Sequence, residues 1–411
     1  MEGNGIIRAD VAVAGGGLIG PALALALARA GFEVAVIDRL AEPVRADPEF
    51  DGRAYAVALA SARLLGVLGL WRGLEPLAQP IRDIVVGEGV PGSHPGAMLH
   101  FDPRETDEGR VGWILEDRYL RRALIDAMDA EPRIRQVAPA EVAGAAFDGP
   151  RARIALADGR AVEAGLAVAA DGRRSALGAA AGIRRQVFGY DQTGLVNAIE
   201  HELPHHGTAH QSFFPGGPFA VLPLPGNRSS LVWSERSAEA RRLHALPDDV
   251  FTAEIAARVG GRLGAIRLAG RRWAYPLDLT LAERYAAPRL VLAGDAAHGV
   301  HPIAGQGMNM GLRDVAALAE VLVEAARRGE DIGAVDVLER YQRWRRFDAT
   351  AMALGMDALN RLFSNANPML RGVRDLGLAV VGRIGPLRRG FMREATGLAG
   401  DVPRMLRGHP L

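Results

Sequence analysis

Residues 11–38 read VAVAGGGLIGPALALALARAGFEVAVID, and this stretch decides the fold. Val11 to Ala14 form an apolar run that predicts a buried strand. Pro21 to Ala30 have the length and composition of a helix, and Phe32 to Ile37 predict a second strand after a glycine stop signal. The order of strand, glycine turn, helix and strand is typical of a parallel α/β sheet.

The turn has the spacing G-x-G-x-x-G at Gly15, Gly17 and Gly20. In a dinucleotide site the first glycine permits a tight turn, the second lets the backbone approach a pyrophosphate, and the third lets helix pack on strand. The helix N-terminus offers N–H groups to phosphates, and Asp38 can accept ribose hydroxyls. The stretch therefore predicts a Rossmann-like nucleotide site. The alternative is a plain strand–turn–helix with a solvated Asp38.

A membrane or secretory interpretation of the same region is weaker. Val11 to Ala28 carries no charge, and its length suits a membrane span or a signal sequence. Three consecutive glycines interrupt this segment, however, and a second apolar strand follows Gly31. We therefore expect a soluble chain.

The composition is that of an ordinary globular protein. At about 150 residues per domain, 411 residues indicate two or three domains, with 49% apolar residues, 24% charged residues and a net charge of +1. A nucleic-acid binder would be more basic, so we expect no nucleic-acid partner. The absence of cysteine excludes disulfides, thiolate catalysis and cysteine-based metal sites.

A second glycine-rich stretch, AGDAAHGVHPIAGQGMNMGLRD at residues 293–314, indicates which nucleotide is bound. Residues 289–293 predict a buried strand, and Asp295 follows at its carboxyl end, where α/β sheets bind ligands. A carboxylate there can accept hydrogen bonds from the polyol chain of a flavin. A helix is expected from about Gly307 to Arg327, and its N-terminal dipole would favour the anion formed on a reduced flavin. Glycines that let backbone lie against a flat ring are Gly305, Gly307 and Gly311.

A third signal completes a family pattern. Ala167 to Ala170 predict a strand, and Asp171-Gly172 a turn after it. With Gly15–Gly20 and Gly294–Asp295, this turn resembles the three ordered motifs of the class A flavoprotein monooxygenases. More narrowly, four segments resemble the coenzyme Q ring-hydroxylase family: Phe50 to Trp71, Ile114 to Leu124, Phe214 to Leu224 and His301 to Asp314.

The resemblance implies an α/β fold of the para-hydroxybenzoate-hydroxylase type. A Rossmann-like FAD-binding domain would carry an inserted, mostly β substrate domain and a helical C-terminal region. We expect the FAD domain to be discontinuous, over residues 1–75, 105–180 and 280–345. The substrate domain would take residues 76–104 and 181–279, and the C-terminal helices residues 346–411.

The resemblance also implies roles for single residues. Arg39 and Arg53 resemble residues near the FAD adenosine and the flavin ring, and Arg118 one near the ribityl and pyrophosphate groups. Pro302 resembles the proline whose carbonyl borders substrate and flavin. The loop and helix start around the isoalloxazine would comprise Gly305, Gln306, Gly307, Met308 and Asn309.

Other positions leave alternatives open. Asp171 is either structural or related to a pyridine nucleotide, and His301 has either a catalytic role or ordinary loop hydrogen bonds. Gly178 and Asp117 depart from the family, which often has Arg and Asn there. The candidate catalytic residues are therefore His301 and Pro302, and the candidate cofactor-binding residues are Gly15, Gly17, Gly20, Asp38, Arg39, Arg53, Arg118, Asp171, Gly294, Asp295, Gly305, Gln306, Gly307, Met308 and Asn309.

The implied activity is FAD-dependent hydroxylation of an aromatic ring. In this family reduced flavin and O2 form a C4a-hydroperoxide, and an electron-rich phenol attacks its distal oxygen. We expect FAD as cofactor, NAD(P)H as electron donor and a polyprenyl phenol of ubiquinone biosynthesis as substrate. The alternatives are a soluble phenol as substrate, a flavin reductase or halogenase, and a non-catalytic flavin-bound scaffold in a biosynthetic complex.

Two further features concern metals and membranes. The tract HELPHHGTAH has irregularly spaced histidines (His201, His205, His206 and His210), which favours a solvated loop over a zinc site. Leu370 to Leu411 hold eight arginines against three acids, a balance of +5, with apolar residues between them. That pattern suits either a solvated face or an anionic membrane surface. We expect a cytoplasmic protein, with peripheral contact to the inner membrane face as the open alternative.

Overall fold

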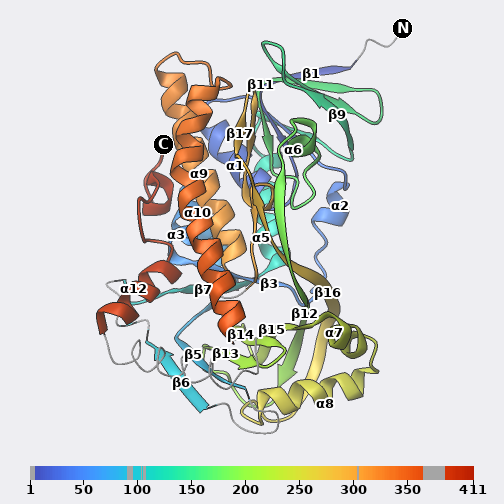
Figure 1. Ribbon diagram of the computed structural model, residues 1–411, viewed down its shortest axis with the longest axis vertical. Coiled ribbons are helices and arrows are strands. Elements are labelled where there is room, and N and C mark those ends of the chain that lie inside the picture. The colour runs from blue at the N-terminus through green and yellow to red at the C-terminus, as the bar shows by residue number, and fades with distance from the viewer. Residues whose placement is uncertain (1–4, 90–95, 103, 105–107, 303–304, 364–384) are drawn as a thin grey trace.

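Two eight-stranded sheets lie at opposite ends of an elongated molecule, and the long helices α9 (Gln306–Arg327) and α10 (Val335–Phe363) run beside them (Figure 1). The computed structural model describes residues 5–89, 96–102, 104, 108–302, 305–363 and 385–411. Within these residues, no helix is both long and apolar enough to cross a bilayer.

The first sheet has a parallel centre. Its order is β17-β18-β11-β1-β2-β8, and the antiparallel strands β10 and β9 extend it from β11. The strands are β1 (Ile6–Ala14), β2 (Val34–Ile37), β8 (Ile134–Val137), β9 (Val142–Ala146), β10 (Ala152–Leu156), β11 (Ala161–Ala169), β17 (Ala286–Ala287) and β18 (Leu290–Leu292).

The N-terminal unit forms as its sequence predicts. Helix α1 (Ile19–Arg29) follows β1 and is buried from Gly20 to Ala28. It ends at Arg29, and the chain turns at Gly31, whose φ of +103° suits glycine. A helix that is apolar on all sides is stable in water only when it is covered, and both α9 and β2 pack against α1.

The second sheet is mostly antiparallel, in the order β19-β16-β12-β15-β14-β13-β5-β6. Helices α7 (Ser237–His244) and α8 (Asp248–Val259) cover one of its faces, and the core between them contains Phe219, Trp233 and Phe251. The strands are β5 (Asp83–Glu88), β6 (Gly96–Phe101), β12 (Arg185–His201), β13 (Thr208–Phe214), β14 (Gly217–Leu224), β15 (Arg228–Arg236), β16 (Ile266–Ala282) and β19 (His298–Gly299).

A small third sheet, β3-β7-β4, lies between the two large ones (Figure 1). It consists of β3 (Ala54–Ala58), β7 (Gly112–Glu116) and β4 (Gln79–Pro80). The other helices are α2 (Glu42–Arg45), α3 (Leu59–Val67), α4 (Trp71–Leu74), α5 (Asp117–Asp129), α6 (Ala176–Ala180) and α12 (Gly385–Ala395), with short 3-10 turns η1 (Glu75–Leu77), η3 (Gly294–Ala296) and η5 (Arg404–Arg407).

The expected domain limits stay predictions, and several elements cross them. Strand β19, from the chain after the Gly294-Asp295 turn, pairs with β16 and so joins the second sheet. Helix α10 begins at Val335, before the expected limit of 346, because its first turns are part of the first core. Val337, Leu338 and Tyr341 are buried there, and the Tyr341 hydroxyl donates to Leu292 O.

The C-terminal segment returns to the first sheet's helices. Met405 and Leu406 of η5 are buried, and η5 packs on α3 and α9. Arg313 of α9 donates to the carbonyls of Ala399 (2.7 Å) and Asp401 (3.2 Å). Of the basic segment from Leu370 to Leu411, residues 370–384 lie outside the described residues.

Candidate cofactor and active site

The first glycine loop has room for a ligand at one glycine and none at the other two. A Cβ on Gly15 would lie 2.1 Å from Ala170 O, and a Cβ on Gly20 would lie 1.9 Å from Gly15 O. No atom of the described residues comes within 4 Å of a Cβ built on Gly17. The open side of the loop is therefore at Gly17, where a pyrophosphate can approach the backbone.

Asp38 directly follows β2 and supports this loop. Its Oδ2 accepts from the Gly16 N–H at 2.6 Å, and its Oδ1 accepts from the Leu40 N–H at 2.7 Å. Each carboxylate oxygen has a second lone pair for a ribose hydroxyl. Arg39 next to it is exposed.

Arg45 of α2 was not anticipated from the sequence. Its guanidinium is buried (5% exposed), and Nη2 donates to Gln136 Oε1 at 2.9 Å. Nε and Nη1 have no hydrogen-bond partner among the described residues, and Nη1 lies 2.6 Å from where a Cβ on Gly16 would be. Unpaired buried donors are rare in proteins. A buried cation beside the glycine loop suits a polyanionic nucleotide.

The two later motifs meet at the carboxyl edge of the first sheet. Gly294 turns the chain with a φ of +61°, and the Asp295 side chain is half exposed. Arg173, two residues after Asp171, lies with Nε 3.3 Å from Asp295 Oδ2. The same guanidinium donates to Asp278 Oδ1 (2.7 Å) and to Val300 O (2.9 Å).

Asp171 itself makes local hydrogen bonds. Its Oδ2 accepts from the N–H groups of Ala176 (2.7 Å) and Leu177 (3.4 Å), and the Ser175 hydroxyl accepts from Gly178 N–H at 3.0 Å. These are caps of helix α6. The geometry agrees with the structural alternative for Asp171, and a cofactor role for it stays a prediction.

Gly305 is the N-cap of helix α9; it has a φ of +61° and lies against Ala56 of β3. The Asn309 amide joins these elements: its Oδ1 accepts from Ala58 N–H (3.0 Å) and the Ser61 hydroxyl (2.8 Å), and its Nδ2 donates to Ala56 O (2.9 Å). Asn309 thus fixes the first turn of α9 on β3 with its polar atoms. Gln306 and Gly307 are half-buried, and Met308 is buried.

Gly311 serves helix packing, contrary to the expectation that it faces the flavin ring. A Cβ there would come within 2.6 Å of Ile19 Cδ1, because α9 crosses α1 at this point. At Gly307 the nearest atom, Val300 Cγ2, would be 3.9 Å away. Residues 303–304, which precede Gly305, lie outside the described residues.

Arg53 lies between the third sheet and the second sheet. Asp117, the position where the family often has Asn, is buried and accepts from Arg53 Nη2 (3.1 Å), Tyr55 OH (2.8 Å) and Arg121 Nε (2.6 Å). The Arg53 guanidinium also lies 4.9 Å from the Trp273 ring centre. Burial raises the pKa of the Tyr55 phenol, and the charge of Asp117 raises it further.

Arg118 is held by protein groups. Its Nε donates to Glu116 Oε2 at 2.7 Å and its Nη1 to Pro48 O at 3.0 Å. Glu116 is fully buried and also accepts from Arg228 Nη2 at 2.7 Å. The Arg228–Glu116 contact joins β7 to β15 of the second sheet.

His301 is buried (1% exposed), and its ring packs edge-on against Tyr190 with 5.3 Å between ring centres. Burial and the nearby charge of Arg173 lower the pKa of His301 to about 4. The imidazole is therefore neutral at neutral pH. Pro302 beside it is half-buried.

The histidines of the HELPHHGTAH tract lie on strands β12 and β13 and in the turn between them, and Tyr275 lies on β16. Tyr275 is partly exposed and stacks on Trp273 with 6.2 Å between ring centres. His201 bonds to Leu203 O (2.8 Å) and to Ser229 Oγ (3.0 Å), and His205 to Leu224 O (2.7 Å). Within the parts of the chain that the structure describes, no group of three or more His, Asp or Glu side chains could hold a metal ion.

The chain matches a known protein family over most of its length. The FAD binding domain family matches residues 8–354. The chain belongs to this family. It is an FAD-dependent monooxygenase.

Relatives resemble this flavoprotein along almost its whole length. Ubiquinone hydroxylase UbiL of Rhodospirillum rubrum is 47% identical over 406 residues, which cover 98% of this chain and 94% of that protein. The 3-demethoxyubiquinol 3-hydroxylase of Escherichia coli is 37% identical over 394 residues, 95% and 98% of the two chains. The solved p-nitrophenol 4-monooxygenase of Pseudomonas putida has the same fold, with a TM-score of 0.81 at 20% identity over 96% and 99% of the chains.

Proposed function

We propose that this enzyme hydroxylates the aromatic ring of a polyprenylated phenol in ubiquinone biosynthesis, with FAD as cofactor, O2 as oxygen source and NAD(P)H as electron donor. The full-length similarity to ubiquinone hydroxylase UbiL supports the substrate class. The observation that carries the proposal is that both Asp295 and Arg53 adjoin β16 of the second sheet: Arg173 joins Asp295 to Asp278, and the Arg53 guanidinium lies over the Trp273 ring. A site between a nucleotide sheet and a second sheet can enclose a cofactor ring and a substrate together.

Different residues of the chain would bind different groups of the cofactor. Gly15, Gly17 and Gly20 with the N-terminus of α1 would hold the pyrophosphate, and Asp38 with Arg39 the adenosine. Asp295 would accept hydrogen bonds from the polyol. The backbone from Gly305 to Asn309 would lie along the flavin ring, with Arg53 and Arg118 near the ring and the ribityl chain.

When bound, FAD supplies the redox chemistry that transfers one oxygen atom from O2 to the ring. The protein's part is to orient the substrate and exclude water. His301 is suited to orientation, because a neutral imidazole can donate one hydrogen bond and accept another. The carbonyl of Pro302 is proposed to border substrate and flavin.

Contact with an anionic membrane surface would give access to a polyprenylated substrate. The support for it is the charge balance of +5 in residues 370–411. On helix α12, Arg389, Phe391 and Arg393 are exposed together. Basic residues beside an exposed aromatic ring suit the headgroup region of a bilayer on the inner membrane face.

The test uses the full chain reconstituted with FAD, a reductant and isotopically labelled O2. A polyprenyl phenol in detergent and a soluble phenol of the same ring substitution are assayed in parallel. Label in the ring hydroxyl of the prenylated product, with much slower turnover of the soluble phenol, is the expected result. Faster turnover of the soluble phenol would contradict the substrate class, and peroxide as the only oxygen product would contradict hydroxylation.

A further inference from the structure

Asp314 lies at the centre of a buried network that the motifs do not account for. It is in the third turn of α9 and is fully buried. Three elements donate to its carboxylate: Gly294 N–H to Oδ2 (2.9 Å), His298 Nε2 to Oδ2 (2.6 Å) and Arg345 Nε of α10 to Oδ1 (2.8 Å). One carboxylate therefore connects the Gly294-Asp295 turn with both long helices.

The charge of Asp314 is maintained inside the protein. Burial alone would raise its pKa, but His298 and Arg345 outweigh that effect and hold the pKa of Asp314 below its ordinary value. An ionised acceptor makes stronger hydrogen bonds than a neutral one. The N–H of Gly294 is thus fixed by a charge-assisted bond.

The turn is held from two sides. Asp314 holds its backbone at Gly294, and Arg173 lies 3.3 Å from the Asp295 carboxylate. Gly294 has a left-handed backbone, and a Cβ there would lie 3.1 Å from Ile19 Cγ1. Without Asp314, the turn would keep the contact between Arg173 and Asp295 but would lose the hydrogen bond that fixes its backbone at Gly294.

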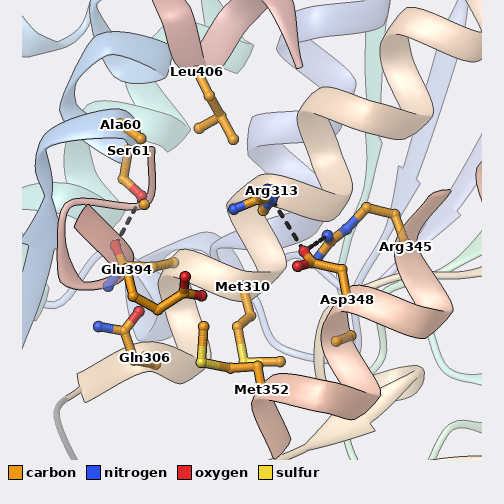
Figure 2. Close-up of a pocket in the computed structure, with 13 residues that line it drawn as sticks. Ala60, Ser61, Gln306, Met310, Arg313, Arg345, Asp348, Met352, Glu394 and Leu406 are labelled. Atoms are coloured by element: carbon orange, nitrogen blue, oxygen red, sulfur yellow. Dashed lines mark hydrogen bonds and ion pairs between the residues drawn. The ribbon is translucent and has the colours of Figure 1, made fainter. Parts of the chain in front are cut away.

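A second acid provides a matched comparison. Asp348 accepts from Arg345 Nη1 and lies 3.2 Å from Arg313 Nε, beside a small pocket lined by Gln306, Met310 and Glu394 (Figure 2). Asp348 shares Arg345 with Asp314 and is one-third exposed. No hydrogen bond joins its carboxylate to the Gly294-Asp295 turn within the described residues.

We propose that Asp314 is a positioning residue for the cofactor: through Gly294 and His298 it holds Asp295 where that carboxylate meets the polyol of FAD. This inference rests on the proposed role of Asp295. It predicts a selective defect, because the adenosine and pyrophosphate half of FAD would be held by the Gly15–Gly20 loop and Asp38 at the other end of the site.

The experiment compares Asp314→Asn, Asp314→Ala and Asp348→Asn in the full chain. FAD is titrated into each apoprotein by flavin fluorescence, ADP is titrated separately as a probe of the adenosine half, and the visible circular dichroism of bound flavin is recorded. We expect Asp314→Ala to lose about 10-fold or more in FAD affinity, the loss of one charge-assisted bond. Asp314→Asn, which keeps an acceptor oxygen, should lose less. ADP affinity should not change, and Asp348→Asn should resemble the parent.

The outcomes separate this inference from the proposed function. A parent protein that binds no FAD would overturn the cofactor site as a whole. A parent that binds FAD, with equal FAD losses in Asp314→Ala and Asp348→Asn or with parallel losses of ADP affinity, would show that Asp314 is only structural. If both Asp314 variants fail to fold, His298→Gln removes a donor to Asp314 instead. This variant must lose FAD affinity and keep the ADP affinity of the parent.

Discussion

Arg173 Nε lies 3.3 Å from Asp295 Oδ2, so that the Asp171-Gly172 turn and the Gly294-Asp295 turn, 122 residues apart at these two side chains, form one edge of the site. The guanidinium is also held by Asp278 Oδ1 and Val300 O. It therefore stays in place when Asp295 bonds to a ligand. A half-exposed carboxylate beside a fixed cation can accept hydrogen bonds from hydroxyls on its open side.

Asp171 and Asp295 should respond differently to removal of their carboxylates. In Asp295→Ala, FAD hydroxyls lose a charge-assisted acceptor worth roughly 1.5–3 kcal/mol, about a 10- to 150-fold loss of affinity. Asp171→Ala removes a helix cap, which costs about 1 kcal/mol of stability, and should leave FAD affinity close to that of the parent. FAD titration and urea unfolding of both variants give the comparison. A large loss of FAD affinity in Asp171→Ala would show that Asp171 contributes to cofactor binding.

The glycine loop allows a second comparison. Gly17→Ala should fold as the parent does, because a Cβ there meets nothing within 4 Å among the described residues. The new methyl group would enter the space proposed for the pyrophosphate, so FAD affinity should fall by at least about 10-fold, which corresponds to about 1.4 kcal/mol.

Gly20→Ala should instead lower the stability of the fold. Its Cβ would lie 1.9 Å from Gly15 O, a backbone atom that can move only if the loop moves. Overpacking of this kind costs about 1–3 kcal/mol. Thermal unfolding of the FAD-free proteins separates the two cases. The interpretation of the loop is wrong if Gly17→Ala is the less stable variant, or if it binds FAD like the parent.

His210 should make the protein sensitive to acid. Burial and the charge of Arg262 lower the pKa of His210 to about 4, against about 6.5 in an unfolded chain. Between these pH values the His210 side chain is protonated in the unfolded state and neutral in the folded state. The free energy of unfolding therefore decreases as pH falls from 6.5 towards 4. The loss from this residue amounts to at most about 3 kcal/mol. Urea unfolding of the parent and His210→Gln at pH 7, 5.5 and 4.5 measures it. We expect a flatter pH dependence in the variant, and identical slopes would contradict the assignment.

The sequence predicts those parts of the site that are defined by residues close together in the chain. The unit from β1 to β2 and the strand before Asp295 follow from apolar runs bounded by glycine, and α9 starts at Gln306, one residue from its expected start. These elements need only neighbouring residues for their definition. The fold class followed because three such local signals stand in the order of one family.

Residues defined by distant partners could not be predicted in this way. Arg45 donates a hydrogen bond to Gln136 of β8, and Asp314 accepts from the Gly294 turn, His298 and α10. A single arginine or aspartate has no periodicity that marks it. The position of Gly311 was misjudged for the same reason, since only the crossing of α1 and α9 gives it a packing role.

Helix α12 offers the last prediction, which concerns membranes. Its exposed Arg389 and Arg393 flank the half-exposed Phe391, on a segment that lies far from β1 in the molecule (Figure 1). Each basic residue near an anionic surface contributes about 1 kcal/mol, so Arg389→Gln with Arg393→Gln should weaken binding to anionic vesicles by about 30-fold at low salt.

Arg8→Gln, at an exposed position on β1, is the matched control for a general charge effect. Neither change touches a core, so the unfolding temperatures should stay together. Co-sedimentation with vesicles containing phosphatidylglycerol, at low and at physiological salt, measures the binding. Because surface charges are screened over about 8 Å at physiological salt, the difference between variants should shrink there. Equal binding by the α12 variant and the Arg8 variant would mean that this helix does not face the membrane.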